Sequence, residues 1–360
     1  MATLKVPARL PELIKVTFAK ALSNGDLFYF ATHAQDVRVG ALTFQLRFSP
    51  ALANKPKAPP TKRETAETTP SKPFDPFAYT TPPPPPLFVG DVGAAHFLVL
   101  NKFAIVPGHF ILATRVYKPQ TDVLEADDLH ATLACLRAYQ EAASPAPLSS
   151  SSSSGGGDDD DDDGDGEDGA LFAFFNCGEH SGASQPHRHI QMLPVAAMRE
   201  GLPADSAWRV LATQLNGGGG GGGGVAAPFT TFSQRITLDT SQEELHAAYL
   251  RLYAQAVRAV KGEESEVSTT GEAAISYNLA MTRDRLVLCP RRAEGDAVRD
   301  PDTGHVVGKV SLNGTMLAGT ALVKTEAEWE ALRKNPRALT TVLKSVGIPQ
   351  LDFVEESNKL

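Results

Sequence analysis

Asn176-Cys-Gly-Glu-His-Ser-Gly-Ala-Ser-Gln-Pro-His-Arg-His-Ile-Gln191 is the stretch that decides the fold. The apolar run before it, Leu171 to Phe175, is typical of a buried strand, and in His187 to Leu193 polar and apolar residues alternate as in a second strand. A strand directs alternate side chains to opposite faces. One face should therefore carry His187, His189, Gln191 and Leu193, and the other face Arg188, Ile190 and Met192.

The loop between these two strands, Cys177 to Pro186, has the composition of an anion-binding turn. Gly178 and Gly182 permit backbone angles that bring N–H groups close to a ligand. Successive N–H groups in such turns form a concavity that binds anions. Side-chain donors are added by Ser181, Ser184 and Gln185. The loop and the two histidines beside it indicate chemistry on a phosphate.

The same stretch resembles the signature of the fungal-type diadenosine tetraphosphate phosphorylases (ATP adenylyltransferases), the transferase branch of the histidine triad superfamily. That branch has a glutamine, here Gln191, where the hydrolase branch has the third histidine of its His-x-His-x-His pattern. The resemblance covers most of the chain, because further blocks also look like this family. They are Ala51 to Pro56, Leu100 to His109, and Tyr277-Asn278 with Asn313 to Lys324.

The resemblance implies a nucleotidyltransferase that phosphorolyses diadenosine 5',5'''-P1,P4-tetraphosphate with inorganic phosphate, reversibly, to ATP and ADP. His189 would attack the α-phosphorus, release ATP and carry AMP until phosphate removes it as ADP. A neutral imidazole can do this near neutral pH because its unperturbed pKa is about 6.5. The resemblance also implies that the second ring nitrogen of His189 donates to the backbone carbonyl of His187. Gln191 cannot carry a proton, which fits a transferase whose acceptor is phosphate.

Substrate binding is predicted at the loop and in the further blocks. Lysine is a compact point charge suited to polyphosphate oxygens, and Lys55 and Lys102 are candidates on that basis. The other candidates from the resemblance are Asn101, Asn176, Ser181, Gly182, Ala183, Ser184, Gln185, Asn278 and Lys324. His109, which follows the Pro107-Gly108 turn, is predicted to be structural. His180 either lines the pocket or caps the loop.

Other functions and ligands stay open at this point. One alternative is a related sugar-nucleotide nucleotidyltransferase or phosphorylase, and another is a non-catalytic nucleotide-binding protein of the same fold. A structural zinc site needs about four ligands, whereas the cysteines are scattered at Cys135, Cys177 and Cys289. We therefore expect no protein-bound metal and no covalent cofactor, although a divalent cation such as Mg²⁺ can accompany the nucleotide substrate.

The 360 residues, 42% of them hydrophobic, suit a globular enzyme with ample core. Nine of the 42 acidic residues lie between positions 158 and 168, so 33 remain against 34 basic residues. This balance gives no support to binding of nucleic acid or membranes, and no apolar run reaches the roughly 20 residues that span a bilayer. The expected partners are small-molecule substrates: dinucleoside polyphosphate, ATP, ADP and phosphate. We expect a monomer.

Localisation is expected to be cytoplasmic, because three cysteines, an odd number, argue against a disulfide framework. The N-terminus suits a short surface helix rather than a secretory signal. Its apolar residues are interrupted by Lys5, Arg9, Glu12, Lys15 and Lys20. An organelle transit peptide remains an open alternative.

The predicted fold is α+β, of the histidine triad or galactose-1-phosphate uridylyltransferase type, with a largely antiparallel sheet flanked by helices. We divide the chain into an N-terminal catalytic region, 1–216, with an insert at about 147–169, and a C-terminal region, 225–360, that completes the fold. Within the Pro-rich stretch from Pro56 to Pro86, Phe74 to Phe77 resembles a family segment that packs against the body. Helices are expected at Glu125 to Ala143, Ser241 to Val260 and Glu326 to Lys334, and strands at Phe97 to Val106, His109 to Val116, Ala274 to Ala280, Arg285 to Leu288, Val306 to Leu312 and Ala318 to Val323.

Overall fold

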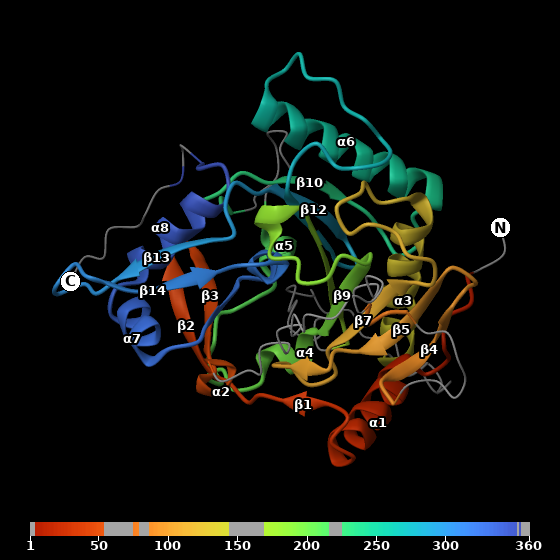
Figure 1. Cartoon of the computed structure of the whole chain (residues 1–360), viewed down its shortest axis with the longest axis horizontal. Coiled ribbons are helices and arrows are strands. Elements are labelled where there is room, and N and C mark those ends of the chain that lie inside the picture. Colours follow the sequence, from red (N-terminus) through yellow and green to blue (C-terminus); the bar gives the residue numbers. More distant parts are fainter. Residues whose placement is uncertain are drawn as a thin grey trace, which may run out of the picture.

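The computed structural model of the chain describes residues 4–53, 75–78, 86–143, 169–215, 225–350 and 353. Lys55 and most of the low-complexity stretches lie outside the described residues. The largest element is an eight-stranded sheet, in which every neighbouring pair of strands is antiparallel (Figure 1). Its order is β10 (Phe232–Arg235), β12 (Arg285–Pro290), β11 (Tyr277–Met281), β8 (Leu171–Cys177), β9 (His189–Pro194), β7 (Phe110–Thr114), β5 (His96–Leu100) and β4 (Phe88–Val92). The predicted α+β class with a largely antiparallel sheet is confirmed.

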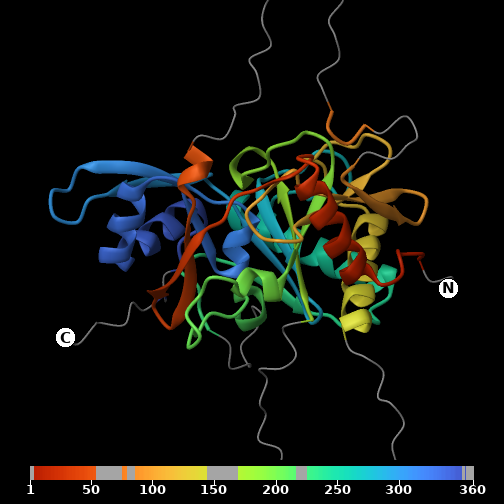
Figure 2. The ribbon, with the colours of Figure 1, turned by 90° about the horizontal axis from the view of Figure 1, so that it is seen from below.

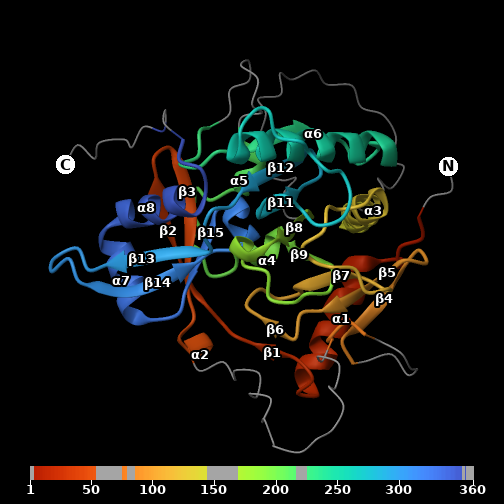
Figure 3. The ribbon, with the colours of Figure 1, turned by 45° about the horizontal axis from the view of Figure 1, so that its top comes forward.

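Three helices cover one face of this sheet: α1 (Leu10–Ser23), α3 (Ala126–Ala143) and α6 (Gln242–Lys261). Helix α6 lies against β12 and β10 (Figure 3), and α1 lies beside α3 (Figure 2). The predicted apolar stripe of α3 is buried in this layer, at Leu129, Leu133 and Leu136. Helix α6 begins with a capping box in which Ser241 and Glu244 satisfy each other's backbone N–H groups. Ile190 and Met192 of β9 point into the same layer.

A second layer forms on the opposite face and holds the small sheet β15 (Thr320–Val323), β3 (Leu42–Phe48) and β2 (His33–Val39). Here β15 runs parallel to β3, so segments from the two ends of the chain are paired. Leu193 of β9 packs in this layer. The remaining elements are β1 (Phe28–Tyr29), α2 (Pro50–Ala53), β6 (Phe103–Ala104), η1 (Glu179–Ser181), α4 (Val195–Arg199), α5 (Leu211–Gln214), β13 (Gly295–Arg299), β14 (Val306–Ser311), η2 (Gly314–Ala318), α7 (Glu326–Lys334) and α8 (Pro336–Val346).

Several strand predictions were too long, and a local cause is visible for two of them. The strand expected from Phe97 to Val106 stops at Leu100, because the Asn101 side chain accepts a hydrogen bond from the Phe103 N–H and turns the chain. Phe103 then joins the separate two-residue pairing of β6 with β1. The strand expected from Ala318 begins at Thr320, since η2 precedes it and Gly319 adopts a positive φ of 73°.

Both predicted regions contribute to the main sheet, because β11 pairs with β8 and is followed in the sheet by β12 and β10. Among the described residues, no helix is long and apolar enough to cross a membrane.

Candidate functional site

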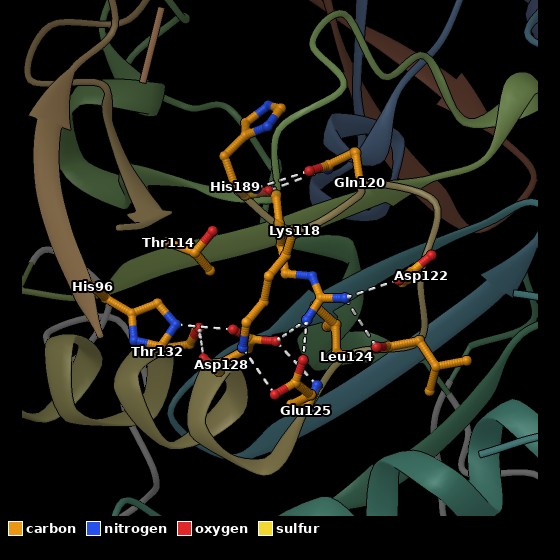
Figure 4. A network of polar contacts seen from close by, with 12 residues as sticks. His96, Thr114, Lys118, Gln120, Asp122, Leu124, Glu125, Asp128, Thr132 and His189 are labelled. Carbon is orange, nitrogen blue, oxygen red and sulfur yellow. Dashed lines mark hydrogen bonds and ion pairs between the residues drawn. The ribbon is translucent and has the colours of Figure 1, made fainter. Parts of the chain in front are cut away.

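Strands β8 and β9 separate at the point where the loop opens, and the side chain of Gln120 stands between them. Their pairing ends at Phe174 opposite Gln191. Two positions further along, Asn176 and His189 are bridged instead by the Gln120 amide. Figure 4 shows its contact with the backbone of His189. Its oxygen accepts from the His189 N–H at 2.8 Å, and its nitrogen donates to the carbonyls of Asn176 at 2.8 Å and His189 at 3.2 Å. Sequence reasoning missed this buried glutamine, because nothing in its local sequence marks it.

His189 is held in one tautomer. Its Nδ1 lies 2.8 Å from the backbone carbonyl of His187, and a carbonyl can only accept. Nδ1 therefore carries the proton, and Nε2 has the free lone pair that a nucleophile needs. Burial lowers the pKa of His189 to about 4; the hydrogen bond to the His187 carbonyl opposes this shift, and the His187 ring adds to it. The ring is therefore neutral at neutral pH.

The ring of His187 is fixed by protein groups on both sides. Its Nε2 lies 3.0 Å from the hydroxyl and 2.8 Å from the carbonyl oxygen of Thr114, and its Nδ1 lies 2.7 Å from the Asp75 carboxylate. The ring is buried, so the contact of His187 with the nucleophile is made by its backbone carbonyl.

Gln191 faces a cavity of about 220 Å³, which it shares with His109, Gly182, Asn313 and Lys324. His109, which the sequence predicted to be structural, has its side chain on the wall of this cavity, where it is hydrogen-bonded to Gln191. Burial lowers the pKa of His109 to about 4, against the hydrogen bond to Gln191. The spacing of β7 carried a signal for this, since His109 lies two residues before Ile111, which is paired with Gln191.

Asn101 holds His109 from the other side. Its amide nitrogen lies 3.1 Å from Nδ1 and 3.4 Å from Nε2 of His109. Its oxygen is already engaged by the Phe103 N–H at 3.0 Å. The substrate contact of Asn101 stays a prediction, and the structure adds that its side chain supports His109.

Asn176 and Asn278 are buried behind the loop and brace it. The Asn278 amide donates to the Asn176 side-chain oxygen and to the Ser181 carbonyl, both at 2.9 Å. The Asn176 oxygen also accepts from the Gly314 N–H at 2.8 Å, which ties the loop to η2. Arg291, which the sequence reasoning missed, donates to the Asn278 oxygen and to the carbonyl of Leu312.

The loop has the predicted backbone, with positive φ angles of 83° at Gly178 and 78° at Gly182. Ser181 is buried, and its hydroxyl donates to the Gly178 carbonyl at 2.7 Å. The outer part of the loop is exposed at Ala183 and Ser184 and half-buried at Gln185. His180 is half-buried, and its backbone N–H donates to the Ser276 hydroxyl. Of the predicted loop residues, only Gly182 lines the cavity.

The predicted lysines are placed differently from one another. Lys324 is exposed at the rim of the cavity that Gln191 lines. Lys102 is exposed as well, but its ammonium lies 6.0 Å from the centre of the Phe103 ring and does not line that cavity. Lys55 lies outside the described residues.

Arg188 anchors β9 from the opposite face, as the alternation predicted. Its guanidinium contacts the carboxylates of Asp128 at 2.8 Å and Glu125 at 3.1 Å. Asp128 also accepts from His96 at 2.8 Å, and Figure 4 shows His96, Asp128 and Glu125 together at the start of α3. Burial alone would raise the pKa of Asp128, but the His96 hydrogen bond and the Arg188 charge outweigh it and lower that pKa.

Family profiles match almost the whole chain. The profile described as the Ap4A phosphorylase N-terminal domain matches residues 2–143 and 167–208, and that of the ATP adenylyltransferase C-terminal domain matches residues 225–349. The chain belongs to the Ap4A phosphorylase family. The resemblance of the His-x-His-x-Gln stretch is thus confirmed.

Relatives within this family extend over nearly the full length. Two are from Saccharomyces cerevisiae: Protein APA1, 24% identical over 354 residues, and diadenosine 5',5'''-P1,P4-tetraphosphate phosphorylase 2, 26% identical over 358 residues. Each match covers 96% of both chains. The crystal structure of yeast Ap4A phosphorylase Apa2 has a TM-score of 0.66 at 22% identity, and its complex with Ap4A has a TM-score of 0.65 at 22% identity. Both cover 96% of this chain and 99% of the other, and they show that the fold is shared.

Proposed function

We propose that this chain phosphorolyses diadenosine tetraphosphate to ATP and ADP through an AMP–His189 intermediate. The observation that carries the proposal is the 2.8 Å contact between His189 Nδ1 and the His187 carbonyl, which leaves Nε2 unprotonated. The low pKa of about 4 keeps the ring a nucleophile throughout the neutral range. Family membership and the phosphorylase relatives support the choice of substrate.

The chemistry divides into two displacements. In the first, Nε2 of His189 bonds to the α-phosphorus, the bond from that phosphorus to the bridging oxygen breaks, and ATP leaves. In the second, a phosphate oxygen bonds to the same phosphorus, the P–N bond breaks, and ADP leaves with the Nε2 lone pair restored. In both steps the proton stays on Nδ1, which donates to the His187 carbonyl.

The orientation of the Gln191 amide follows from the direction of its hydrogen bonds. The Asn101 oxygen accepts from Phe103, so its amide nitrogen must donate to the unprotonated nitrogen of His109. The remaining N–H of a neutral His109 then donates, and only the oxygen of Gln191 can accept it. The Gln191 NH₂ group is left to face the cavity, where it can donate to a phosphoryl oxygen. Removal of one well-placed donor of this kind typically costs about 3 kcal/mol of transition-state stabilisation.

Polyphosphate would lie along the cavity, between Gly182 and the Lys324 ammonium. Within the described residues, no group of three or more His, Cys, Asp and Glu side chains is placed to hold a metal. A divalent cation such as Mg²⁺ would therefore bind through the polyphosphate itself. Asn176 and Asn278 would act by holding the loop, and Lys55 and Lys102 remain proposed contacts with the outer phosphates.

A cytoplasmic, monomeric enzyme remains part of the proposal. The three cysteines are free and buried, which suits a reducing compartment.

The test is to incubate the purified full chain with diadenosine tetraphosphate, with and without inorganic phosphate, and to resolve the nucleotides. ATP plus ADP should form only with phosphate, and His189→Ala should abolish both. His305→Ala, at an exposed histidine outside the loop and the cavity, is the matched control and should retain turnover. ATP plus AMP without phosphate would make the protein a hydrolase. Turnover of a sugar nucleotide alone would favour a related sugar-nucleotide nucleotidyltransferase or phosphorylase. Absence of any turnover would favour a non-catalytic nucleotide-binding protein.

A further inference from the structure

Arg47 of β3 lies on the wall of the cavity that Gln191 lines, between the small sheet and the main sheet. Its register partner on β15, Leu322, lines the same cavity, and so does the buried Met198. Lys324, two residues beyond Leu322, stands at the exposed rim. Arg47 is only 2% exposed, whereas side chains between packed sheets are normally apolar. The buried end of the cavity therefore carries a cation.

The protein gives the Arg47 guanidinium hydrogen bonds only to neutral acceptors. Its Nε donates to the Gln45 side-chain oxygen at 2.8 Å, and its Nη1 donates to the Thr32 hydroxyl at 2.7 Å. Its Nη2 donates to the carbonyls of Met198 and Glu200. A guanidinium has five N–H groups. Among the described residues, one N–H of Nη1 is therefore left without an acceptor.

The charge of Arg47 is likewise unmatched. Among the described residues, no Asp or Glu forms an ion pair with it, whereas the buried Arg188 contacts two carboxylates. Burial lowers the pKa of Arg47, and the charges of Tyr29 and the exposed Glu200 only partly oppose this shift. Arg291 also bonds neutral acceptors, but it does not line the cavity. A buried charge is costly without a partner, and an anion in the cavity would supply one.

The rest of the cavity wall also suits an anion. Among the described residues that line it, Arg47 and Lys324 are cationic and the exposed Glu294 is acidic. His109 is neutral at pH 7, because burial lowers its pKa to about 4, and Gln191 presents its NH₂ group. The cavity of about 220 Å³ is smaller than the pockets of roughly 300–1,000 Å³ that take drug-sized ligands. It has room for a phosphate group but not for a further nucleoside.

We propose that Arg47 forms an oxyanion subsite at the buried end of this cavity, which takes a phosphate group. The proposal deepens the proposed function, on which it rests, because it adds a subsite to the one between Gly182 and the Lys324 rim. The ligand is either free inorganic phosphate or one phosphate of a nucleotide chain. The recognising chemistry is the same for both, a charge-assisted hydrogen bond from a guanidinium to a phosphate oxygen.

The first experiment measures the dissociation constants of inorganic phosphate, ATP and AMP by isothermal titration calorimetry of the purified full chain. Arg47→Gln retains a donor but removes the charge. It should raise the dissociation constant of phosphate, of ATP or of both about tenfold to a hundredfold, the range for the loss of a charge-assisted hydrogen bond. The constant of AMP should not change. A loss for phosphate alone identifies free phosphate as the ligand, and a loss for ATP identifies the nucleotide chain.

Arg38→Gln is the matched control for this experiment. Arg38 is an exposed arginine of the neighbouring strand β2, where it donates to the Thr43 hydroxyl. Its replacement should leave all three dissociation constants unchanged. Unchanged constants in folded Arg47→Gln, or an equal loss for AMP, would overturn the subsite. Absence of both phosphate and ATP binding in the wild type would overturn it as well.

A second pair of variants leaves Arg47 in place. Leu322 is paired with Arg47 and lines the cavity, so Leu322→Glu sets a carboxylate beside the guanidinium. That carboxylate should compete with the ligand and raise the same dissociation constants, whereas the isosteric Leu322→Gln should raise them much less. Equal effects of the two folded variants would show that charge plays no part, and the subsite would be refuted. A wild-type chain that binds phosphate through Arg47 but forms no ATP and ADP would refute only the proposed reaction.

Discussion

Replacement of Gln120 by leucine should destabilise the protein and displace the nucleophile together. The leucine is similar in size but makes none of the three hydrogen bonds that the amide forms with the backbone of His189 and Asn176. The bond from the Gln120 amide to the His189 carbonyl, at 3.2 Å, is the weakest of the three, and its loss is not counted in the expected cost. A buried N–H and a buried carbonyl are then left unpaired, at about 1–3 kcal/mol each. The expected loss in the free energy of unfolding is about 2–6 kcal/mol.

The assay for Gln120 is urea unfolding at pH 7, with turnover measured on the same preparations. Gln242→Leu is the matched control, because that amide donates at the surface to Asp127 and its loss should change stability by less than about 0.5 kcal/mol. Gln120→Glu retains an acceptor for the His189 N–H but sets a carboxylate against the carbonyl of Asn176. Its stability should therefore recover as acid protonates the new carboxyl. A loss below about 0.5 kcal/mol for Gln120→Leu would show that the strands close without the bridge, and the reasoning would be wrong.

Three further outcomes follow from buried charges and thiols. Asp128→Asn should cost about 1.5–3 kcal/mol, because it removes the buried carboxylate partner of Arg188 and leaves the guanidinium with the exposed Glu125. Since the pKa of Asp128 is lowered in the folded state, its stabilisation in the wild type is present above the unfolded pKa and is lost as pH falls through the folded value. His109 and His189, with pKa values lowered to about 4, bind protons more weakly than in the unfolded chain, so stability should fall between pH 6.5 and 4 by about 1.4 kcal/mol per pH unit for each ring. Urea titrations across pH measure both effects, and a flat profile would contradict them. Burial raises the pKa of Cys177 and Cys289 to about 12. Neither thiol should therefore react with iodoacetamide until the protein is unfolded. Rapid labelling of the native protein would contradict this, because it would show that the thiols are accessible.

The sequence predicted those parts of the site that lie within one continuous segment. The alternation in β9 placed His189 and Gln191 on one face, and the two glycines gave the loop its backbone. Residues that act across the fold were not predictable in this way. Gln120, Arg291 and Asp75 are single polar residues without local periodicity, and only the tertiary structure shows which carbonyls and rings they contact.

Long elements were predicted well because their periodicity extends over several turns or pairs. The helix expected at Glu326 to Lys334 has those bounds, and that expected at Glu125 to Ala143 differs by one residue. Ends that depend on a single side-chain hydrogen bond were misplaced, as at Asn101. The contact of Asn101 with His109 was not predicted, because the pairing of β5 with β7 brings the two residues together.

The pairing of β11 with β8 and of β15 with β3 has a consequence for how the chain must be made. About a hundred residues separate the strands of the first pair, and far more separate those of the second. During synthesis the ribosome would expose β8 and β3 with unsatisfied edges, long before their neighbours emerge. Such non-local contacts slow folding. A chain severed between residues 215 and 225 should therefore yield two fragments that aggregate when each is refolded alone. The environment of His189 should form again only when the two fragments are refolded together.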